Sequence, residues 1–149
     1  MTSAPQLTLV HALDDRQVDQ LLALYADLWW AHDRQRADVV RMLAGCLPFA
    51  LVDPDGVIAA FGRIVTDGVY KALLCDVVVA APHRGRGLGQ RLIDEILAHP
   101  VIAQVGHVEL YCLPDLIPFY ERWGFTDALG EVTFMRRARA LVGDRPLNS

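Results

Sequence analysis

A glycine-rich stretch near the middle of the chain has residue types suited to binding phosphate. It reads Arg84-Gly85-Arg86-Gly87-Leu88-Gly89-Gln90 and follows the β-branched run Val77–Val79. Leu88, Leu92 and Ile96 then recur at helical spacing, so the pattern predicts a strand, a glycine turn and a helix. The first N–H groups of such a helix lack intrahelical acceptors, and the positive end of its dipole points at the turn. The stretch therefore predicts a seat for a phosphate group.

Two familiar phosphate loops do not fit this spacing. A Walker loop needs Lys followed by Ser or Thr after its last glycine, and here Gln90-Arg91 follows Gly89. The dinucleotide fingerprint needs the G-x-G-x-x-G spacing, which Gly85, Gly87 and Gly89 do not have. A tight turn whose glycines serve packing alone is the structural alternative, so a second signal in the chain is needed.

That second signal lies about thirty residues further along the chain. Phe119-Tyr120-Glu121-Arg122-Trp123-Gly124-Phe125 combines aromatic residues with a glycine that ends a predicted helix. This stretch resembles the late helix of the GNAT acyltransferase superfamily, and Arg84-x-x-Gly87-x-Gly89 resembles the coenzyme A loop of that superfamily. The two motifs also occur in the family's order and at the family's spacing. The resemblance covers about Leu73–Arg137.

The resemblance implies transfer of an acetyl or other acyl group from coenzyme A to a primary amine by direct attack. It implies acetyl-CoA as the cofactor, with its pyrophosphate on the loop, where Arg84, Arg86 or Arg91 reaches the phosphates, and its pantetheine arm along a strand that splays from its neighbour. Tyr120 matches the family tyrosine that protonates the departing thiolate, and a buried structural tyrosine is the alternative. The implied cofactor-binding residues are Val77, Val78, Val79, Arg84, Gly85, Arg86, Gly87, Leu88, Gly89, Gln90, Tyr120 and Arg122.

Asp76 is a charged residue in the apolar strand ahead of the loop, a costly place unless it is paired or functional. Some family members that acetylate sugar amines carry Glu-Asp-Val-Val-Val here, whereas this chain has Cys75 before Asp76. Asp76 is either the base or acceptor ligand that serves the amine, or an edge carboxylate held by an arginine such as Arg63. Glu109 and Tyr111, on one face of the next predicted strand, are further candidates.

The acceptor pocket of this family is built largely from the first helices, where the resemblance fades. An aromatic wall with an arginine would suit an aromatic or carboxylate-bearing amine; alternatively one tryptophan packs in the core and the charges are solvated. The candidate substrate-binding residues are Trp29, Trp30, Arg34, Asp76 and Tyr111. One departure concerns the cofactor: many family members have an asparagine seven residues before the tyrosine, where this chain has Leu113, which puts one pantetheine contact in doubt.

Composition predicts one globular domain over residues 1–149, with its core at about 7–138 and a loose tail at 140–149. The 149 residues are 53% hydrophobic, but no apolar run approaches the roughly 18 residues of a membrane span, and no signal-peptide pattern opens the chain. The net charge of −4 argues against a nucleic-acid partner. Three separated cysteines predict reduced thiols in the cytoplasm, and no residue set has metal-site spacing.

Turn signals and periodicity predict the order β-α-α-β-β-β-α-β-α-β-β. The fold class is α/β (α+β): a GNAT-like mixed, mostly antiparallel central sheet of about six to seven strands flanked by about four helices. The expected strands are 7–10, 49–52, 57–65, 70–79, 105–112 and two within 125–137; the expected helices begin at Asp14 or Asp15, Arg36, the glycine loop and Pro114.

Two other functions remain open from the sequence. One is a catalytically weak acyl-CoA-binding sensor or interaction module. The other is a protein or peptide N-acetyltransferase, whose open cleft the bulky Trp29-Trp30 segment would obstruct. The sequence names neither the small-molecule amine acceptor nor the length of the acyl group. A homodimer is also left open, because the last strands of such folds often pair between subunits.

Overall fold

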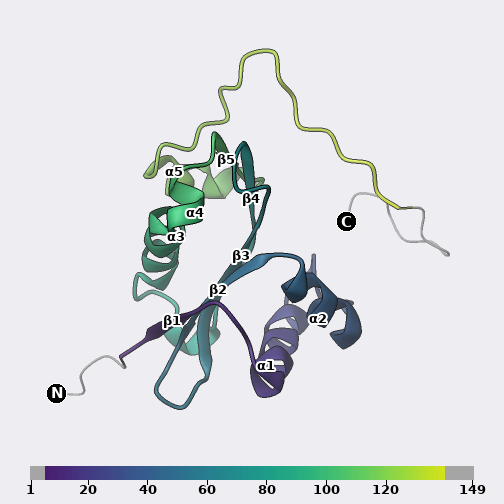
Figure 1. Cartoon of the computed structure of the whole chain (residues 1–149), viewed down its shortest axis with the longest axis vertical. Helices are drawn as coiled ribbons and strands as arrows, with labels where there is room; N and C mark the ends of the chain where they lie inside the picture. The colour runs from purple at the N-terminus through teal and green to yellow at the C-terminus, as the bar shows by residue number, and fades with distance from the viewer. Residues whose placement is uncertain (1–5, 140–149) are drawn as a thin grey trace. The chain divides into compact units, whose positions relative to one another are not determined.

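The computed structural model describes residues 6–139, which fall in two compact units, 6–110 and 111–139. Figure 1 labels the elements along the chain. The first unit contains β1 (Thr8–Val10), α1 (Asp15–Ala26), α2 (Arg36–Ala44), β2 (Leu47–Val52), β3 (Ile58–Thr66), β4 (Lys71–Val79), the 3-10 helix η1 (Ala81–His83), α3 (Leu88–Ala98), α4 (Pro100–Ala103) and β5 (His107–Glu109). The second contains the 3-10 helix η2 (Pro114–Leu116) and α5 (Ile117–Glu121). The predicted loose tail, 140–149, lies outside the described residues.

Within residues 6–139, five strands form one sheet in the order β1-β2-β3-β4-β5. Neighbouring strands are antiparallel except β4 and β5, which run parallel and are connected through α3 and α4. This mixed, mostly antiparallel sheet confirms the predicted fold class. The expected six to seven strands were too many for the described residues.

Local signals set the ends of the helices. Asp14 and Gln17 form a capping box at the start of α1: the Asp14 carboxylate accepts from the Gln17 N–H (2.8 Å), and the Gln17 side chain accepts from the Asp14 N–H (3.0 Å). α2 ends at Gly45, a residue type that commonly follows the last turn of a helix. Pro100 stops α3 and begins the single-turn helix α4, because the first position of a helix needs no N–H. The sequence did not predict α4.

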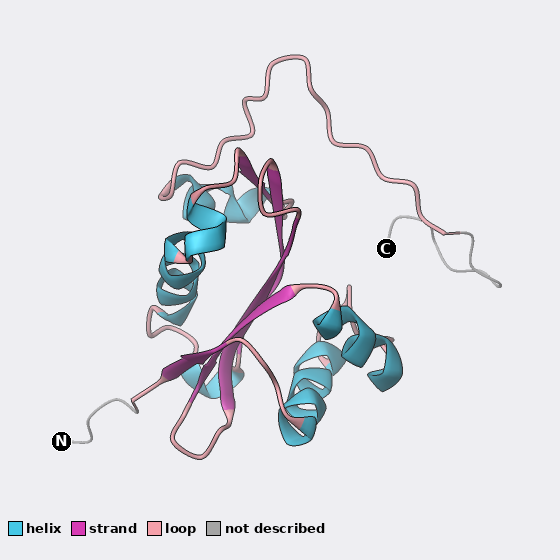
Figure 2. Ribbon diagram, in the orientation of Figure 1, coloured by secondary structure: helices cyan, strands magenta, loops and turns pink. Residues whose placement is uncertain are grey.

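Helices cover both faces of the sheet in the first unit. α1 and α2 lie against one face and α3 against the other (Figure 2). The core under α1 and α2 includes the buried side chains of Leu21, Tyr25, Phe61 and Val78. On the opposite face, Leu92 and Ile96 of α3 approach to 3.4 Å of the position that a Cβ on Gly62 would occupy. A Cβ at Gly62 would thus be in van der Waals contact with α3, and a side chain longer than that of alanine would push α3 away from the sheet.

β4 contains one residue more than its pairing with β3 needs. Phe61 pairs with Val78 and Arg63 with Cys75, so Gly62 alone lies opposite both Asp76 and Val77. Asp76 has a φ of +60°, in the left-handed region that aspartate enters more readily than most residues with a side chain. The resulting β-bulge directs the Asp76 side chain toward α1 and the segment after it.

β4 and β5 pair over three residues only, from Lys71–His107 to Leu73–Glu109. Within the described part of the first unit, residues 74–79 of β4 have no partner strand on that side. The Ala80 N–H donates to the carbonyl of Ala59 in β3 (2.8 Å), so backbone alternation turns the N–H and C=O of Val79 toward the open edge. The pairing stops after Leu73 because β5 ends at Glu109, so the expected divergence of two strands around 110–112 stays a prediction.

The second unit has less regular structure than the sequence predicted. Its helix begins as η2 and continues as α5 to Glu121, shortly before Gly124 at φ +85°. The two strands expected within 125–137 are not present in the described residues, and β5 ends at Glu109 instead of reaching Cys112. Leu129 and Val132 instead donate their N–H groups to nearby carbonyls of the same segment. Apolar alternation yields a stable strand only where neighbouring strands complete the ladder, and this segment has none.

The three cysteines are free thiols: Cys75 is buried, and Cys46 and Cys112 are half-buried. Among the described helices, none combines the length and the apolar character that crossing a lipid bilayer requires.

Candidate functional site

The glycine loop lies between β4 and α3, as predicted. Gly85 and Gly87 both have φ +76°, and no atom lies within 4 Å of the position of a Cβ on either. The backbone path therefore requires glycine, because a side chain would be strained at this φ. The open space beside both residues argues against the alternative in which these glycines serve close packing alone.

α3 begins at this loop without a side chain that caps it. Gly87 is the N-cap residue, and its carbonyl accepts the first intrahelical hydrogen bond, from the Arg91 N–H (3.0 Å). The N–H groups of Leu88, Gly89 and Gln90 come before that bond and have no acceptor within the helix. No acidic residue stands in the first turn, so an anion is the fitting partner for these donors and for the helix dipole.

The arginines around the loop differ in what they contact. Arg84 and Arg86 are exposed, and the Arg84 Nε donates to the Val79 carbonyl (3.2 Å). Arg84 therefore folds back to the open edge of β4, beside the phosphate seat. Arg91 instead donates to the Leu7 carbonyl (3.0 Å), which ties α3 to the residue before β1.

Asp76 is the centre of a group of four side chains, here named the Asp76 cluster: Tyr25, Arg34, Arg63 and Asp76. Asp76 Oδ2 accepts from Arg34 Nη1 and from Arg63 Nε, both at 2.6 Å, and from the Tyr25 hydroxyl at 3.0 Å. The Asp76 side chain is 6% exposed. Of the two roles left open by the sequence, the contacts show the carboxylate held by arginines, with Arg63 the partner that was expected and Arg34 a second one.

The electrostatics of the cluster keep Asp76 ionised. Burial opposes ionisation of this carboxyl, but the hydrogen bonds and charges of Arg34 and Arg63 outweigh burial and lower its pKa below the ordinary aspartate value. Burial and the Asp76 charge raise the pKa of Tyr25, so its hydroxyl stays protonated and donates. A carboxylate with a lowered pKa and three donors is a weak proton acceptor, which favours a positioning role over that of a base.

The two tryptophans of the predicted acceptor wall lie in different environments. Trp30 is half-buried, packs against the α1–α2 core and has its ring centroid 6.2 Å from that of Tyr25. Trp29 is 59% exposed. The alternative with one tryptophan packed against the core is therefore what the structure shows. Arg34 departs from that alternative, because it is paired with Asp76 instead of solvated.

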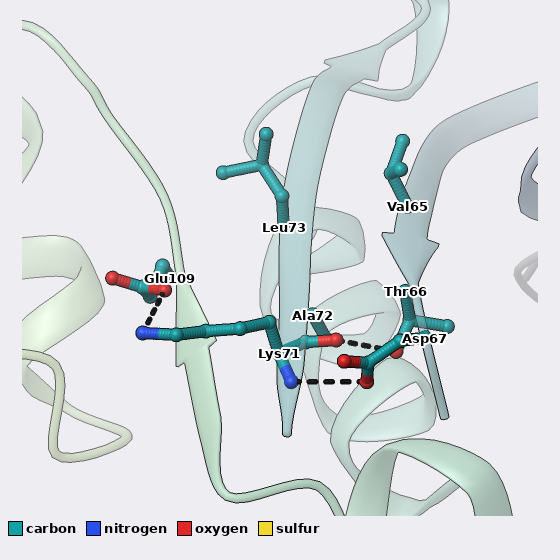
Figure 3. Close-up of a pocket in the computed structure, with 7 residues that line it drawn as sticks. All are labelled: Val65, Thr66, Asp67, Lys71, Ala72, Leu73 and Glu109. Carbon is teal, nitrogen blue, oxygen red and sulfur yellow. Dashed lines mark hydrogen bonds and ion pairs between the residues drawn. The ribbon is translucent and has the colours of Figure 1, made fainter. Parts of the chain in front are cut away.

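Glu109 lies at the other end of β4 from the glycine loop. It forms an ion pair with Lys71 (2.9 Å) beside a hollow of about 270 Å³ that Val65 and Leu73 also line (Figure 3). The Lys71 carbonyl accepts from Thr66 Oγ1 (2.6 Å), so the polar groups around this hollow are engaged with one another. Neither the hollow nor Glu109 adjoins the loop or the Asp76 cluster.

In the second unit, Tyr120 of α5 is buried, with its ring 5.0 Å from that of Phe119 and 6.0 Å from that of Phe125. Burial, together with the charge of Cys112, raises the pKa of Tyr120 to about 12. The hydroxyl is therefore protonated at neutral pH and available as a donor.

Two further predicted site residues also lie in the second unit. The guanidinium of Arg122 is 5.5 Å from the Phe119 ring centroid, and that of Arg136 is 4.8 Å from the Tyr111 ring. The expectation that Tyr111 shares a strand face with Glu109 was wrong, because β5 ends before Tyr111. Leu113, at the position where many relatives have asparagine, is exposed.

Comparison with known proteins identifies the fold family. The model of the acetyltransferase (GNAT) family matches residues 11–125, which include the glycine loop, the Asp76 cluster and Tyr120. The chain belongs to the GNAT family. A crystal structure of a protein assigned to the same family, from Xanthomonas campestris pv. campestris, is 32% identical, with a TM-score of 0.78 over 92% of this chain and 96% of that one.

Two curated GNAT relatives are plant proteins. Serotonin N-acetyltransferase 2, chloroplastic, of Oryza sativa subsp. japonica is 35% identical over 80 residues, which are 52% of this chain and 40% of the relative. GCN5-related N-acetyltransferase 1, chloroplastic, of Arabidopsis thaliana is 30% identical over 83 residues, 54% of this chain and 42% of the relative. The chain thus spans less than half the length of these curated relatives.

Sequence reasoning missed one member of the GNAT chain's Asp76 cluster. Tyr25 falls at the helical spacing of the apolar side chains of α1, so its position in the sequence predicts only a core-facing residue. A tyrosine on a core-facing stripe needs a partner for its hydroxyl, and that need was the available signal.

Proposed function

We propose that this chain transfers an acetyl group from acetyl-CoA to the primary amine of a small molecule. The observation that carries the proposal is the glycine loop, which presents uncapped N–H groups at the end of a strand whose edge is open. Family membership and relatives named as acetyltransferases support the same activity. The rice relative is named for an amine of low molecular mass, which supports a small-molecule acceptor.

The residues of the loop fit the cofactor. The N–H groups of Leu88, Gly89 and Gln90 would hold the pyrophosphate, and the space beside Gly85 and Gly87 admits phosphate oxygens close to the backbone. Arg84 and Arg86 are exposed beside them and add charge. The open edge at 77–79 offers backbone groups to an extended arm. Arg122 as a further cofactor contact stays a prediction.

When bound, acetyl-CoA supplies an acetyl group activated as a thioester. Tyr120 is the proposed proton donor to the sulfur that leaves. With a Tyr120 pKa of about 12 and a thiol pKa near 8.5, complete proton transfer would be uphill by about 5 kcal/mol. We therefore assign Tyr120 the role of a hydrogen-bond donor that stabilises the developing negative charge.

The loop is tested by coenzyme A binding in a thermal melt. Ligand at about 100 times its Kd adds about 2.7 kcal/mol of stability, or roughly 5–10 °C in Tm for a chain of this size. Gly87→Glu places a carboxylate where the pyrophosphate belongs and is expected to abolish the shift. Gly130→Glu is the matched control, because Gly130 also has a positive φ and nothing within 4 Å of its Cβ position.

Activity is tested with acetyl-CoA and a panel of amines, with release of free thiol as the signal. Acetyl transfer to at least one small amine that Gly87→Glu loses and Gly130→Glu keeps would support the proposal. A normal coenzyme A response in Gly87→Glu would mean that the site is misplaced. Coenzyme A binding without transfer to any amine would indicate a sensor instead of an enzyme.

A further inference from the structure

The Asp76 cluster contains two positively charged side chains and only one negatively charged side chain. Arg34 and Arg63 both form ion pairs with the one carboxylate of Asp76, and both address the same oxygen, Oδ2. The second oxygen, Oδ1, has a longer contact of 3.4 Å to Arg34 Nη2. Two guanidinium groups against one carboxylate leave a formal charge of +1 in these four side chains.

Arg34 is held in place on aromatic surfaces. Its guanidinium carbon lies 4.7 Å from the Tyr25 ring centroid and 5.5 Å from that of Trp30. Cation–π contacts and the Asp76 pair fix the guanidinium plane before any ligand arrives. The Arg34 side chain is nevertheless 28% exposed, so a solute can reach it, whereas Arg63 is 15% exposed and lies deeper.

The cluster lies beside the open edge of β4. Asp76 is in the edge segment 74–79, three residues from Val79, or roughly 10 Å at the rise of a strand. α3 occupies the opposite face of the sheet, where Leu92 and Ile96 pack against Gly62. A molecule that reaches this edge from the α1 and α2 face therefore meets Arg34 and Trp30.

We propose that Arg34, supported by Arg63, binds a carboxylate of the acceptor, so that the substrates are amino-carboxylates with an apolar or aromatic body. This inference rests on the proposed function. A planar carboxylate matches the planar guanidinium, and its single charge equals the surplus of the cluster, which a doubly charged phosphate would exceed. The half-buried Trp30 supplies apolar surface for the rest of the acceptor, and the buried Tyr25 ring lies behind the Arg34 guanidinium. Arg34 sets specificity and Asp76 positions it.

The test uses two amines that differ only in the carboxylate, phenylalanine and phenethylamine. In the wild type, kcat/KM is expected to be about 10- to 100-fold higher for phenylalanine, the range of one hydrogen-bonded charge contact. Arg34→Gln should remove this preference through KM, because kcat/KM falls more for phenylalanine than for phenethylamine. Arg34→Lys keeps the charge without the planar fork and should retain part of the preference. Arg16→Gln, a surface substitution on α1, should leave both amines unaffected.

A binding measurement that needs no turnover tests carboxylate binding by Arg34 separately from the proposed acetyltransferase activity. Titration with 3-phenylpropanoate, followed by calorimetry, should show binding that Arg34→Gln weakens about tenfold or more and Arg16→Gln does not. A wild type without preference for phenylalanine, or a preference that survives in Arg34→Gln, would overturn the inference and leave the acetyltransferase proposal standing. If no amine is acetylated, the proposed function fails, and the titration still decides whether Arg34 binds a carboxylate.

Discussion

Replacing Asp76 with asparagine removes the one negative charge that Arg34 and Arg63 share. Asparagine keeps the size of the side chain and also tolerates the positive φ of +60° at this position, so backbone strain is not added. What is lost is the charge on Oδ2, which accepts from three donors. The variant therefore isolates the electrostatic contribution of the cluster.

The expected cost is about 3 kcal/mol in the free energy of unfolding. Removing one partner of a buried ion pair costs roughly 3–5 kcal/mol, because the other charge is left uncompensated. Asp76 is almost fully buried, but Arg34 is 28% exposed and can recover some hydration, which places the estimate at the lower end. For a chain of this length, about 3 kcal/mol corresponds to a decrease in Tm of roughly 6–12 °C.

The stability difference is expected to depend on pH. Because the pKa of Asp76 is lowered in the folded protein, its contribution is fully present above the ordinary aspartate pKa of about 3.9, begins to decline there, and is lost as pH falls through the lowered pKa of the folded state. Urea denaturation of wild type and Asp76→Asn at pH 7 and near pH 3.5 should show the difference shrinking at the lower pH. A difference under about 1 kcal/mol at pH 7, or one that does not change with pH, would refute this account of the cluster.

Activity profiles distinguish a positioning Asp76 from a base. A positioning residue predicts that the ratio of kcat/KM between Asp76→Asn and wild type is nearly constant from pH 6.5 to 9.5. A base predicts a defect that shrinks toward pH 9.5, where about one alkylamine in nine is already neutral. A shrinking defect would return Asp76 to the role of base.

Two further substitutions test other parts of the molecule. Tyr120→Phe should lower kcat about 10- to 1,000-fold and change acetyl-CoA affinity by no more than a few-fold, as steady-state kinetics would show. Since the pKa of Tyr120 is raised to about 12, the wild-type rate should not decline through loss of this proton up to about pH 10, and a decline there would count against the assignment. Gly106→Ala should destabilise the chain by about 1–2 kcal/mol in urea denaturation, because its Cβ would lie 3.1 Å from the Tyr70 carbonyl oxygen between β4 and β5. An unchanged unfolding midpoint would show that this turn can adjust.

Much of the fold was predictable because its signals are local. The capping box at Asp14, the glycine after α2 and the turn at Asp55-Gly56 each act through a few neighbouring residues. The strands expected within 125–137 failed for the opposite reason. Their apolar alternation is a local signal too, but a strand also needs a partner, and partners are not encoded in the segment itself.

The part of the site that a short sequence motif defines by itself was predictable. The glycine loop needs only three glycines and the helix after them. The Asp76 cluster joins α1, the segment after it, β3 and β4, so its membership depends on the tertiary fold. Arg63 was a candidate partner because a charge in an apolar strand needs one, but choosing Arg34 and Tyr25 required the bulge, which no local pattern announced.

The bulge also means that the sheet could be built from a shorter chain. Cys75 and Val78 face the α1 and α2 side, and Val77 between them faces α3, so without residue 76 the strand would alternate regularly with every neighbour in place. Deletion of Asp76 would thus remove the carboxylate and the left-handed backbone together and preserve the register on both sides. An insertion or deletion of one residue elsewhere in β4 would turn the side chains on one side of it to the opposite face of the sheet. Within β4, a change of length at this position therefore preserves the strand register, and its cost is confined to the charges of Arg34 and Arg63, which lose their carboxylate.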